Sequence, residues 1–508
     1  MIATILEKIT SSNREARQLG LLPIVFGCVA FAIAYQILYT FFLSPLRSVP
    51  GPLFARFTRL WELYILHKGH FHRDIVRMHE EQGPVVRIAP NKYSFSEADD
   101  LKKIYAFGGK FPKSEFYDPQ GNPFRKNIFN VRDMTDHADR RRKYASLYSM
   151  STMVAYEDAV DRMTAVCIRK MQQFLSEERS ISLPQFMQYY AFDVIGEISV
   201  DDNFGMMEKE GDTGDLIKSV HAGIRYHARV GLIPETHPWL VRIGGLLTSR
   251  NPFAFLDEVF AKKIALHSTE EFKRKRNPRA EPFITKLLDM EETKNLPRIL
   301  SIDCMGANIG AGSDTTGISL GAAFYFLYTH QDKLAKLREE IDLGQASGQI
   351  SDPVTFQESQ SMPYLQAVIK ETLRLHPAVG YILPRIVPQG GVYLAGRHFP
   401  EGTEVGVSAW VLHYDRKTFG PDPYTYRPER WLESDGSSKE EKETMFFAFG
   451  GGARTCIGKN ISLLEMCKVI PQIVRRFDLE FDRPGEQWVE DCAWFVFTEY
   501  KCRIRDRR

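Results

Sequence analysis

A ten-residue stretch near the C-terminus, from Phe449 to Gly458, constrains the fold more than any other part of the sequence. It reads FGGGARTCIG and stands directly ahead of a helical pattern. Three consecutive glycines cost backbone entropy, so they predict a main chain that turns sharply or approaches another group closely. One cysteine, Cys456, lies inside the stretch. We expect the closely approached group to be bound to its sulfur.

Three other kinds of site could account for this stretch. A phosphate-binding loop needs four residues between its glycine and the Gly-Lys pair, whereas five separate Gly452 from Gly458, and Asn460 follows the lysine. A zinc site needs clustered Cys and His, but there is no C-x-x-C pair and Cys467 stands eleven positions away. A buried structural cysteine after a glycine-rich turn stays open as the alternative.

The stretch follows the pattern F-x-x-G-x-R-x-C-x-G and resembles the haem-binding loop of the cytochrome P450 family. The resemblance implies that Cys456 is the metal ligand, binding the iron of haem b through its thiolate, and that Phe449 shields the sulfur. Such a thiolate pushes electron density onto iron and favours O–O cleavage. Arg454 is then expected to face a haem propionate, because its planar guanidinium matches a carboxylate.

Two further segments resemble haem-propionate partners of the family. His137 and Arg141 lie at positions i and i+4 of a basic helical stretch. The resemblance makes both of them propionate partners, although a solvated charged face would explain the same run. Arg385 follows the segment 377–384, which resembles the family's substrate-contacting strand, and is expected to offer its guanidinium to a propionate.

A helical pattern of 33 residues runs from Pro297 to Thr329 and contains five glycines. Each interior glycine costs about 1 kcal/mol relative to alanine, which indicates either close approach to a flat ligand or tight helix packing. Its centre, residues 311–316 (AGSDTT), resembles the family's oxygen-activating motif. The resemblance makes Asp314 and Thr315 the catalytic pair that passes protons. We expect a π-type bulge to bring both side chains into one relay.

A pair of motifs further on resembles the structural triad of the family. Glu371 and Arg374 form an E-x-x-R pattern, and the sequence YRPERW follows over residues 426–431. E-x-x-R alone is a weak signal, since exposed pairs of this kind are common. By the resemblance, Glu371, Arg374 and Arg430 form a buried triad with a structural role.

Near the N-terminus, residues 21–43 run for 23 positions without Asp, Glu, Lys, Arg or His. At 1.5 Å per residue this helix would span about 34 Å, enough for one bilayer crossing. A cleaved signal peptide is the alternative, but the run starts late, is long, and lacks a small-residue cleavage pattern. The expected organisation is a tail at 1–20, a transmembrane anchor at 21–43, a proline-rich hinge at 44–52 and a catalytic domain at 53–508.

Local patterns predict the remaining elements. They are a β-hairpin at 84–96, a long loop at 107–131 that the family uses to cover the distal pocket, an internal helix at 190–199, strands at 392–399, 403–408 and 494–497, and a last long helix at 457–477. The apolar segment 231–255 is either ordinary core or the roof of a substrate channel that dips into the membrane.

Composition limits the class of protein. The 508 residues are 44% hydrophobic and carry a formal net charge of +2. The overall electrostatic field therefore does not indicate nucleic-acid binding, and no nucleic acid is expected as a partner. Seven cysteines, an odd and scattered set, do not form a disulfide framework and indicate a reducing compartment.

The fold implied by the resemblance is mainly α-helical with small peripheral β-sheets, in a single body on one N-terminal transmembrane helix. The function implied is a haem-thiolate monooxygenase that inserts one atom of O2 into an apolar small molecule. Within the family, the sequence resembles filamentous-fungal enzymes of secondary metabolism, of the pisatin-demethylase-like or benzoate-hydroxylase-like type. The expected substrate is thus a fungal secondary metabolite such as a terpenoid, polyketide or alkaloid intermediate.

Electrons are expected from NADPH through a separate membrane-bound NADPH-cytochrome P450 reductase, because no G-x-G-x-x-G motif occurs in this sequence. The resemblance to the family implies a single-pass protein of the endoplasmic reticulum membrane, with its catalytic domain in the cytosol. Two alternatives stay open: a haem-thiolate isomerase or dehydratase that works without O2, and a haem-binding membrane protein without turnover.

Overall fold

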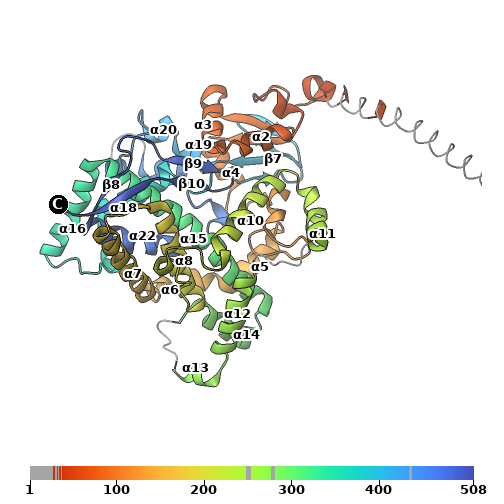
Figure 1. Cartoon of the computed structure of the whole chain (residues 1–508). Coiled ribbons are helices and arrows are strands. Elements are labelled where there is room, and N and C mark those ends of the chain that lie inside the picture. The colour runs from red at the N-terminus through yellow and green to blue at the C-terminus, as the bar shows by residue number, and fades with distance from the viewer. Residues whose placement is uncertain are drawn as a thin grey trace, which may run out of the picture.

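A computed structural model gives the fold (Figure 1) and describes residues 27–28, 31, 34–35, 37–247, 253–275, 281–433 and 438–507. The helices are α2 Leu60–His67, α3 Phe71–Gln82, α4 Ala98–Ile104, α5 Met134–Tyr144, α6 Met150–Val154, α7 Glu157–Ser176, α8 Leu183–Val200, α9 Met206–Lys209, α10 Leu216–Val230, α11 His237–Leu247, α12 Ala254–His267, α13 Glu270–Lys275, α14 Phe283–Lys294, α15 Arg298–Thr329, α16 Gln331–Ala346, α17 Phe356–Gln360, α18 Pro363–Leu375, α19 Ala409–His413, α20 Arg416–Phe419, α21 Lys439–Met445 and α22 Lys459–Val474.

The strands are short and lie at the periphery of the helical body (Figure 1). They are β1 Val85–Ala89, β2 Lys92–Phe95, β3 Ser180–Ser182, β4 Arg385–Ile386, β5 Val392–Leu394, β6 Arg397–Phe399, β7 Glu404–Val407, β8 Phe477–Phe481, β9 Val489–Cys492, β10 Val496–Glu499 and β11 Lys501–Asp506. One sheet has the order β1-β2-β7-β4, and β11 lies between β3 and β8 in another. The mainly α fold with small sheets therefore matches the expectation.

Helix α15 organises the core. It begins after Pro297, whose extended backbone cannot continue a preceding helix, and it packs against α8 and α22. Glycines allow the close contact with α8: a Cβ at Gly317 would lie 2.8 Å from the Cα of Gln188, and one at Gly321 would lie 3.3 Å from the Cα of Pro184. A Cβ at Gly310 would meet nothing within 4 Å. Helix packing thus explains two of the glycines but not all of them.

Most predicted elements occur where the pattern placed them. The hairpin is β1 and β2, the helix at 190–199 lies within α8, and the strands at 392–399 and 403–408 are β5, β6 and β7. Three boundaries differ. The basic helix, expected to start at His137, is α5 and starts at Met134, because the Asp133 side chain accepts a 2.7 Å hydrogen bond from the Asp136 N–H as its cap. The last helix ends at Val474 before β8, and the strand expected at 494 starts at Val496.

The long loop at 107–131 contains a 3₁₀ helix, η3 (Glu115–Gln120), that the sequence pattern did not indicate. Its N-cap is Ser114, whose hydroxyl accepts a 3.3 Å hydrogen bond from the Phe116 N–H. Phe116 and Tyr117 are consequently buried. This loop is therefore held against the core by aromatic side chains.

The predicted tail at 1–20 lies outside the described residues, and so does much of the predicted anchor at 21–43. Within the described part of the chain, no helix combines the length and apolar character that a bilayer crossing requires. The described end of that segment is a π-helical turn, η1 (Tyr39–Leu43). The apolar segment 231–255 is described up to residue 247 and from residue 253, and it contains α11.

Candidate functional site

The glycine-rich loop before α22 turns as its sequence predicts. Gly450 and Gly452 both have left-handed backbones, with φ of 68° and 63°. A Cβ on Gly452 would lie 2.0 Å from the carbonyl oxygen of Tyr105, so only glycine fits there. The Cys456 N–H donates a 2.9 Å hydrogen bond to the carbonyl of Phe449 and closes the loop. The closed turn therefore fixes the position of the backbone that carries the Cys456 side chain.

The sulfur of Cys456 lies at the start of α22. Backbone N–H groups of Gly458 and Lys459 donate to it, and helix N-termini favour a thiolate. Burial raises the pKa of the Cys456 thiol above its ordinary value, while these hydrogen bonds and the charge of Arg141 act in the opposite direction. Cys456 lies deep in the protein, yet its side chain is accessible to solvent-sized molecules. The sulfur therefore faces an internal space.

Helix α15 presents one accessible stripe in the middle of its buried length. Ala311 is exposed, and Ala307 and Thr315, four residues to either side of it, are half-buried. Thr316, next to Thr315, bonds through its hydroxyl to the Ser462 hydroxyl of α22 at 2.6 Å. This contact joins α15 to the helix that follows Cys456. The Thr315 hydroxyl itself donates to the Ala311 carbonyl at 2.9 Å.

Asp314 lies on another face of α15. It is fully buried, and its Oδ1 accepts a hydrogen bond from the Gln188 amide of α8 and lies 3.3 Å from Nε2 of His221 on α10. The expected π-type bulge is absent from this helix, because α15 is α-helical from Arg298 to Thr329. Asp314 and Thr315 are consequently not brought to one side of α15, and their shared proton relay stays a prediction.

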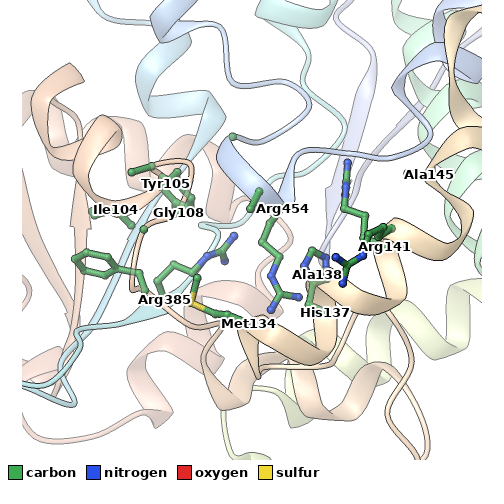
Figure 2. A pocket seen from close by; sticks show the side chains of 16 residues that line it. Ile104, Tyr105, Gly108, Met134, His137, Ala138, Arg141, Ala145, Arg385 and Arg454 are labelled. Carbon is green, nitrogen blue, oxygen red and sulfur yellow. The ribbon is translucent and has the colours of Figure 1, made fainter.

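A cavity of about 510 Å³ gathers four of the predicted cofactor-binding residues. Its lining includes His137 and Arg141 of α5, Arg385 of β4 and Arg454 of the loop. Figure 2 shows these basic side chains gathered along the same space. None of the described residues that line it is acidic. The cavity therefore concentrates positive charge and suits an anionic ligand.

The cavity's charges perturb one another. Burial lowers the pKa of Arg454 to about 10, and the charge of Arg385 adds to the effect. Burial, followed by the charge of Arg454, lowers the pKa of His137 to about 3, so this ring is neutral at pH 7. The Arg454 guanidinium is anchored by hydrogen bonds of 2.9 and 3.2 Å to the carbonyls of Val131 and Arg132. An anion in the cavity would relieve this mutual repulsion.

The predicted triad is present and buried. Arg374 donates two hydrogen bonds of 2.8 Å to the Glu371 carboxylate, and Nε of Arg430 donates a third at 2.9 Å. The indole of Trp431 donates to the same carboxylate at 3.0 Å. Burial alone would raise the pKa of Glu371, but the two arginines outweigh it and hold this pKa below its ordinary value. The triad joins α18 to the segment that precedes the cysteine loop.

Sequence reasoning missed several residues of the site. The Tyr105 hydroxyl donates to the Leu383 carbonyl at 2.6 Å and accepts from the Val407 N–H at 3.0 Å, beneath Arg385. Lys113 donates to the Phe129 carbonyl at 2.6 Å and is buried, and burial holds the pKa of its amine well below its ordinary value. Lys113 lies in what reads as an irregular loop, so no periodicity marks it. The described residues contain no group of three His, Cys, Asp or Glu side chains that could hold a metal ion.

Comparison with known proteins agrees with this geometry. The family model described as Cytochrome P450 matches residues 50–504. A pisatin demethylase of Fusarium vanettenii is 44% identical over 481 residues, which cover 94% of each chain, and a second one from the same organism is 42% identical over 482 residues. A cytochrome P450 monooxygenase of Aspergillus terreus is 33% identical over 465 residues, 87% of this chain and 93% of that protein. This chain therefore belongs to the cytochrome P450 family and is a monooxygenase of that family.

Proposed function

We propose that this protein is a membrane-anchored haem-thiolate monooxygenase that oxidises an apolar small molecule with O2 and electrons from a reductase. The observation that carries the proposal is the position of Cys456. Its sulfur receives two backbone N–H groups at the start of α22 and faces an internal space. Membership of the family implies a haem-thiolate cofactor, an oxygen substrate and an electron donor.

The residues present fit haem b. Cys456 would supply the thiolate that binds the iron, and Phe449 stands in the same closed turn. His137, Arg141, Arg385 and Arg454 would receive the two propionates, whose negative charges the cavity otherwise lacks. When bound, the haem supplies the oxidising power. The chain's own part is to hold the thiolate, compensate the propionates and deliver protons from α15.

We further infer that the protein is a single-pass protein of the endoplasmic reticulum membrane, reduced by NADPH-cytochrome P450 reductase. Exposed apolar side chains support membrane contact: Leu246 and Leu247 of α11 are 86% and 81% exposed, and Phe54 is 67% exposed. Arg59, just before α2, and Glu235, just before α11, form an ion pair of 2.8 Å. This pair connects the segment of Phe54 with the segment of the two leucines. In Figure 1, α2 and α11 lie on the same side of the body as the red turn that η1 (Tyr39–Leu43) forms.

The reaction to test first is oxidative removal of a methyl group from an aromatic ether. Two relatives that align over nearly the whole chain are named pisatin demethylases. In this reaction the methyl ether, O2, NADPH and a proton give the phenol, formaldehyde, NADP⁺ and water. Hydroxylation or epoxidation of a terpenoid, polyketide or alkaloid intermediate by the same site stays within the proposal.

The test uses the full-length chain in microsomes with a fungal reductase and 2-methoxynaphthalene among a panel of aromatic ethers. We expect a thiolate-type spectrum of the reduced carbon monoxide complex, and NADPH consumption that rises with a panel member and yields the matching phenol and formaldehyde. Turnover of a substrate without O2 consumption would favour the isomerase or dehydratase alternative. Haem binding without any substrate-dependent NADPH consumption, across a panel of metabolites from the source organism, would favour the non-catalytic alternative.

A further inference from the structure

The carboxylate of Asp314 is buried in the middle of α15, and one of its two oxygens is unpaired. The side chain is fully buried, and Oδ2 has no hydrogen-bond partner among the described residues. A buried polar atom without a partner loses its hydration and gains nothing in return. The buried Asp193 of α8 shows the satisfied arrangement, because its two oxygens accept from the N–H groups of Met206 and Met207 at 3.0 and 2.9 Å. Asp314 therefore calls for a reason beyond helix packing.

The other oxygen of Asp314 lies against side chains from two neighbouring helices. Oδ1 accepts from the Gln188 amide of α8 and lies 3.3 Å from Nε2 of His221 on α10. The Gln188 amide nitrogen also lies 2.8 Å from Nε2 of His221, so the three groups form one polar cluster. Within the described part of the chain, no other side chain makes a polar contact with this carboxylate. In that part, His221 is thus the one ionisable group that touches Asp314.

The ring of His221 reaches from this carboxylate to the surface. Its side chain is 23% exposed, whereas that of Asp314 is fully buried. The Phe497 ring of β10 lies against it, with 4.5 Å between the ring centroids, and holds the imidazole in place. Histidine takes up and releases protons near neutral pH, and its two ring nitrogens let it accept a proton on one side and release one on the other. His221 therefore connects solvent with a carboxylate that solvent does not reach.

The proposed reaction consumes protons inside the protein. O2 is reduced so that one oxygen atom enters the product and the other leaves as water, which takes up protons as well as electrons. Thr315, next to Asp314 in the chain, lies on the accessible stripe of α15, while Asp314 faces α8 and α10. Protons for that stripe must cross a layer of packed helices. The contact between His221 and Asp314 provides a polar path across this layer.

We propose that His221 is the residue at which protons enter from solvent, and that it passes them to Asp314. In each transfer, a ring nitrogen takes up a proton from water, Nε2 releases one to Oδ1 of Asp314, and the imidazole returns to its starting charge. Because nothing holds Oδ2, the protonated carboxyl can turn and release its proton on the other side. His221 touches neither substrate nor cofactor and acts through Asp314. The inference rests on the proposed function, since it assigns a proton source to the same site.

The first experiment compares two oxidants in wild type and His221→Gln, with 2-methoxynaphthalene or whichever panel member wild type oxidises fastest. Glutamine keeps a polar contact with Asp314 but cannot take up a proton. With NADPH, reductase and O2, protons must come from solvent. With hydrogen peroxide, the oxidant brings its own protons, so that the ether and peroxide give the phenol, formaldehyde and water. Product formation by His221→Gln should fall about three- to fivefold with NADPH and stay within about 1.5-fold of wild type with peroxide.

Arg225→Gln is the matched control. Arg225 lies on α10 four residues after His221, and its exposed side chain pairs with Asp491 at 3.0 Å. This variant should match wild type with both oxidants. The melting temperature and the carbon monoxide spectrum of each variant report on the fold and on haem binding. An equal fall with both oxidants in His221→Gln would overturn the proposal, because it would show that the contact between α10 and α15 only supports the fold.

The second experiment asks whether His221 acts through Asp314, and it needs no peroxide. NADPH-driven rates are measured for His221→Gln, Asp314→Asn and the double variant. Two residues on one path should give a double variant that matches Asp314→Asn within about twofold. The ratio of rates in ordinary and deuterated water should also be larger in His221→Gln than in wild type, because proton entry then limits the cycle more. Effects that multiply in the double variant would overturn the shared path.

Failure of this inference can be told apart from failure of the proposed function. Wild type that oxidises no panel member with either oxidant would overturn both together. An active wild type whose NADPH-driven rate is unchanged in His221→Gln would overturn this inference alone.

Discussion

Nε2 of His221 lies 3.3 Å from Oδ1 of Asp314, and this contact joins α10 to the middle of α15. The same carboxylate oxygen accepts from the Gln188 amide of α8, while Oδ2 of Asp314 has no partner among the described residues. The His221 side chain is 23% exposed, whereas that of Asp314 is fully buried. A path of polar atoms thus leads from the surface to a buried carboxylate beside the accessible stripe of α15.

The first prediction concerns this carboxylate. Asp314→Asn should slow substrate-dependent NADPH consumption and product formation together by about tenfold or more, because an amide cannot carry a proton as a carboxyl can. Steady-state rates in ordinary and deuterated water measure the effect. His221→Gln keeps a polar partner for Asp314 and should slow both rates less. If Asp314→Asn kept the wild-type rates, Asp314 would have no role in proton delivery.

The second prediction separates Thr315 from its neighbour. Thr315→Ala should keep haem and NADPH oxidation but divert electrons to hydrogen peroxide, so that product per NADPH falls several-fold. The physical reason is that its hydroxyl lies on the accessible stripe of α15 and can place a proton there. Thr316→Ala is the control, because that hydroxyl is bonded to Ser462 at 2.6 Å and faces the core.

Measuring NADPH, peroxide and product in the same reaction tests the second prediction. An unchanged product-to-NADPH ratio in Thr315→Ala would point to a hydroxyl supplied by the substrate, or to a rearrangement that does not use O2. Equal uncoupling in Thr316→Ala would show that disturbing the packing of α15 is sufficient, and that the Thr315 hydroxyl has no special role.

The sequence predicted the elements that local chemistry determines. The glycine loop and α15 carry motifs that are continuous in the sequence, and the structure places them as expected. The triad, whose Arg430 stands 59 residues after Glu371, was predicted through the resemblance to the family. What the sequence could not predict depends on contacts between distant segments. Gln188, His221 and Asp314 come from three helices and meet only after packing. The π-type bulge in α15 was expected from the resemblance to the family, and the structure does not contain it. Nothing in the spacing of the glycines requires such a bulge.

The third prediction concerns the proposed iron ligand. Cys456→Ala should abolish the thiolate-type spectrum of the reduced carbon monoxide complex, since no sulfur would remain at the start of α22. Cys467→Ala and Cys492→Ala are controls, because both thiols are buried elsewhere in the core. Absorption difference spectra of purified protein, with haem content measured separately, decide the outcome. A retained spectrum in Cys456→Ala would mean that another residue is the ligand.

The fourth prediction concerns the triad. Arg374→Leu leaves the buried Glu371 short of its two 2.8 Å hydrogen bonds and should destabilise the fold by about 3–5 kcal/mol, as breaking buried ion pairs does. Urea unfolding measures the change. Arg483→Leu, which breaks an exposed pair with Glu486, is the matched control and should change stability little. Similar midpoints for both variants would contradict a structural role for the triad.

The same pair predicts a pH dependence. The folded-state pKa of Glu371 is lowered from the ordinary value of 4.5, so the unfolded chain binds a proton more readily than the folded protein. The stabilisation from this group is therefore fully present above about pH 4.5 and is lost as pH falls through the lowered pKa. Wild type should accordingly lose more stability than Arg374→Leu when the pH is taken from 6 to 3.

The last prediction concerns the membrane. Deleting residues 1–43 should release much of the protein from microsomes while the carbon monoxide spectrum survives, because the site residues all lie in the body of the chain. Release should be incomplete. Leu246 and Leu247 remain exposed on α11, and apolar side chains at the interface retain affinity for lipid. Flotation of the truncated protein with liposomes measures the membrane binding that remains.

Substituting both leucines separates the two contributions to membrane binding. Leu246→Ser with Leu247→Ser in the truncated protein should abolish flotation, because burying each leucine is worth about 1.5–3 kcal/mol. The same pair of substitutions in the full-length chain should leave it in the membrane fraction after carbonate washing, since a spanning helix does not depend on α11. Complete extraction of the unmodified full-length protein by carbonate would contradict the anchor, and α11 would then be the main membrane contact.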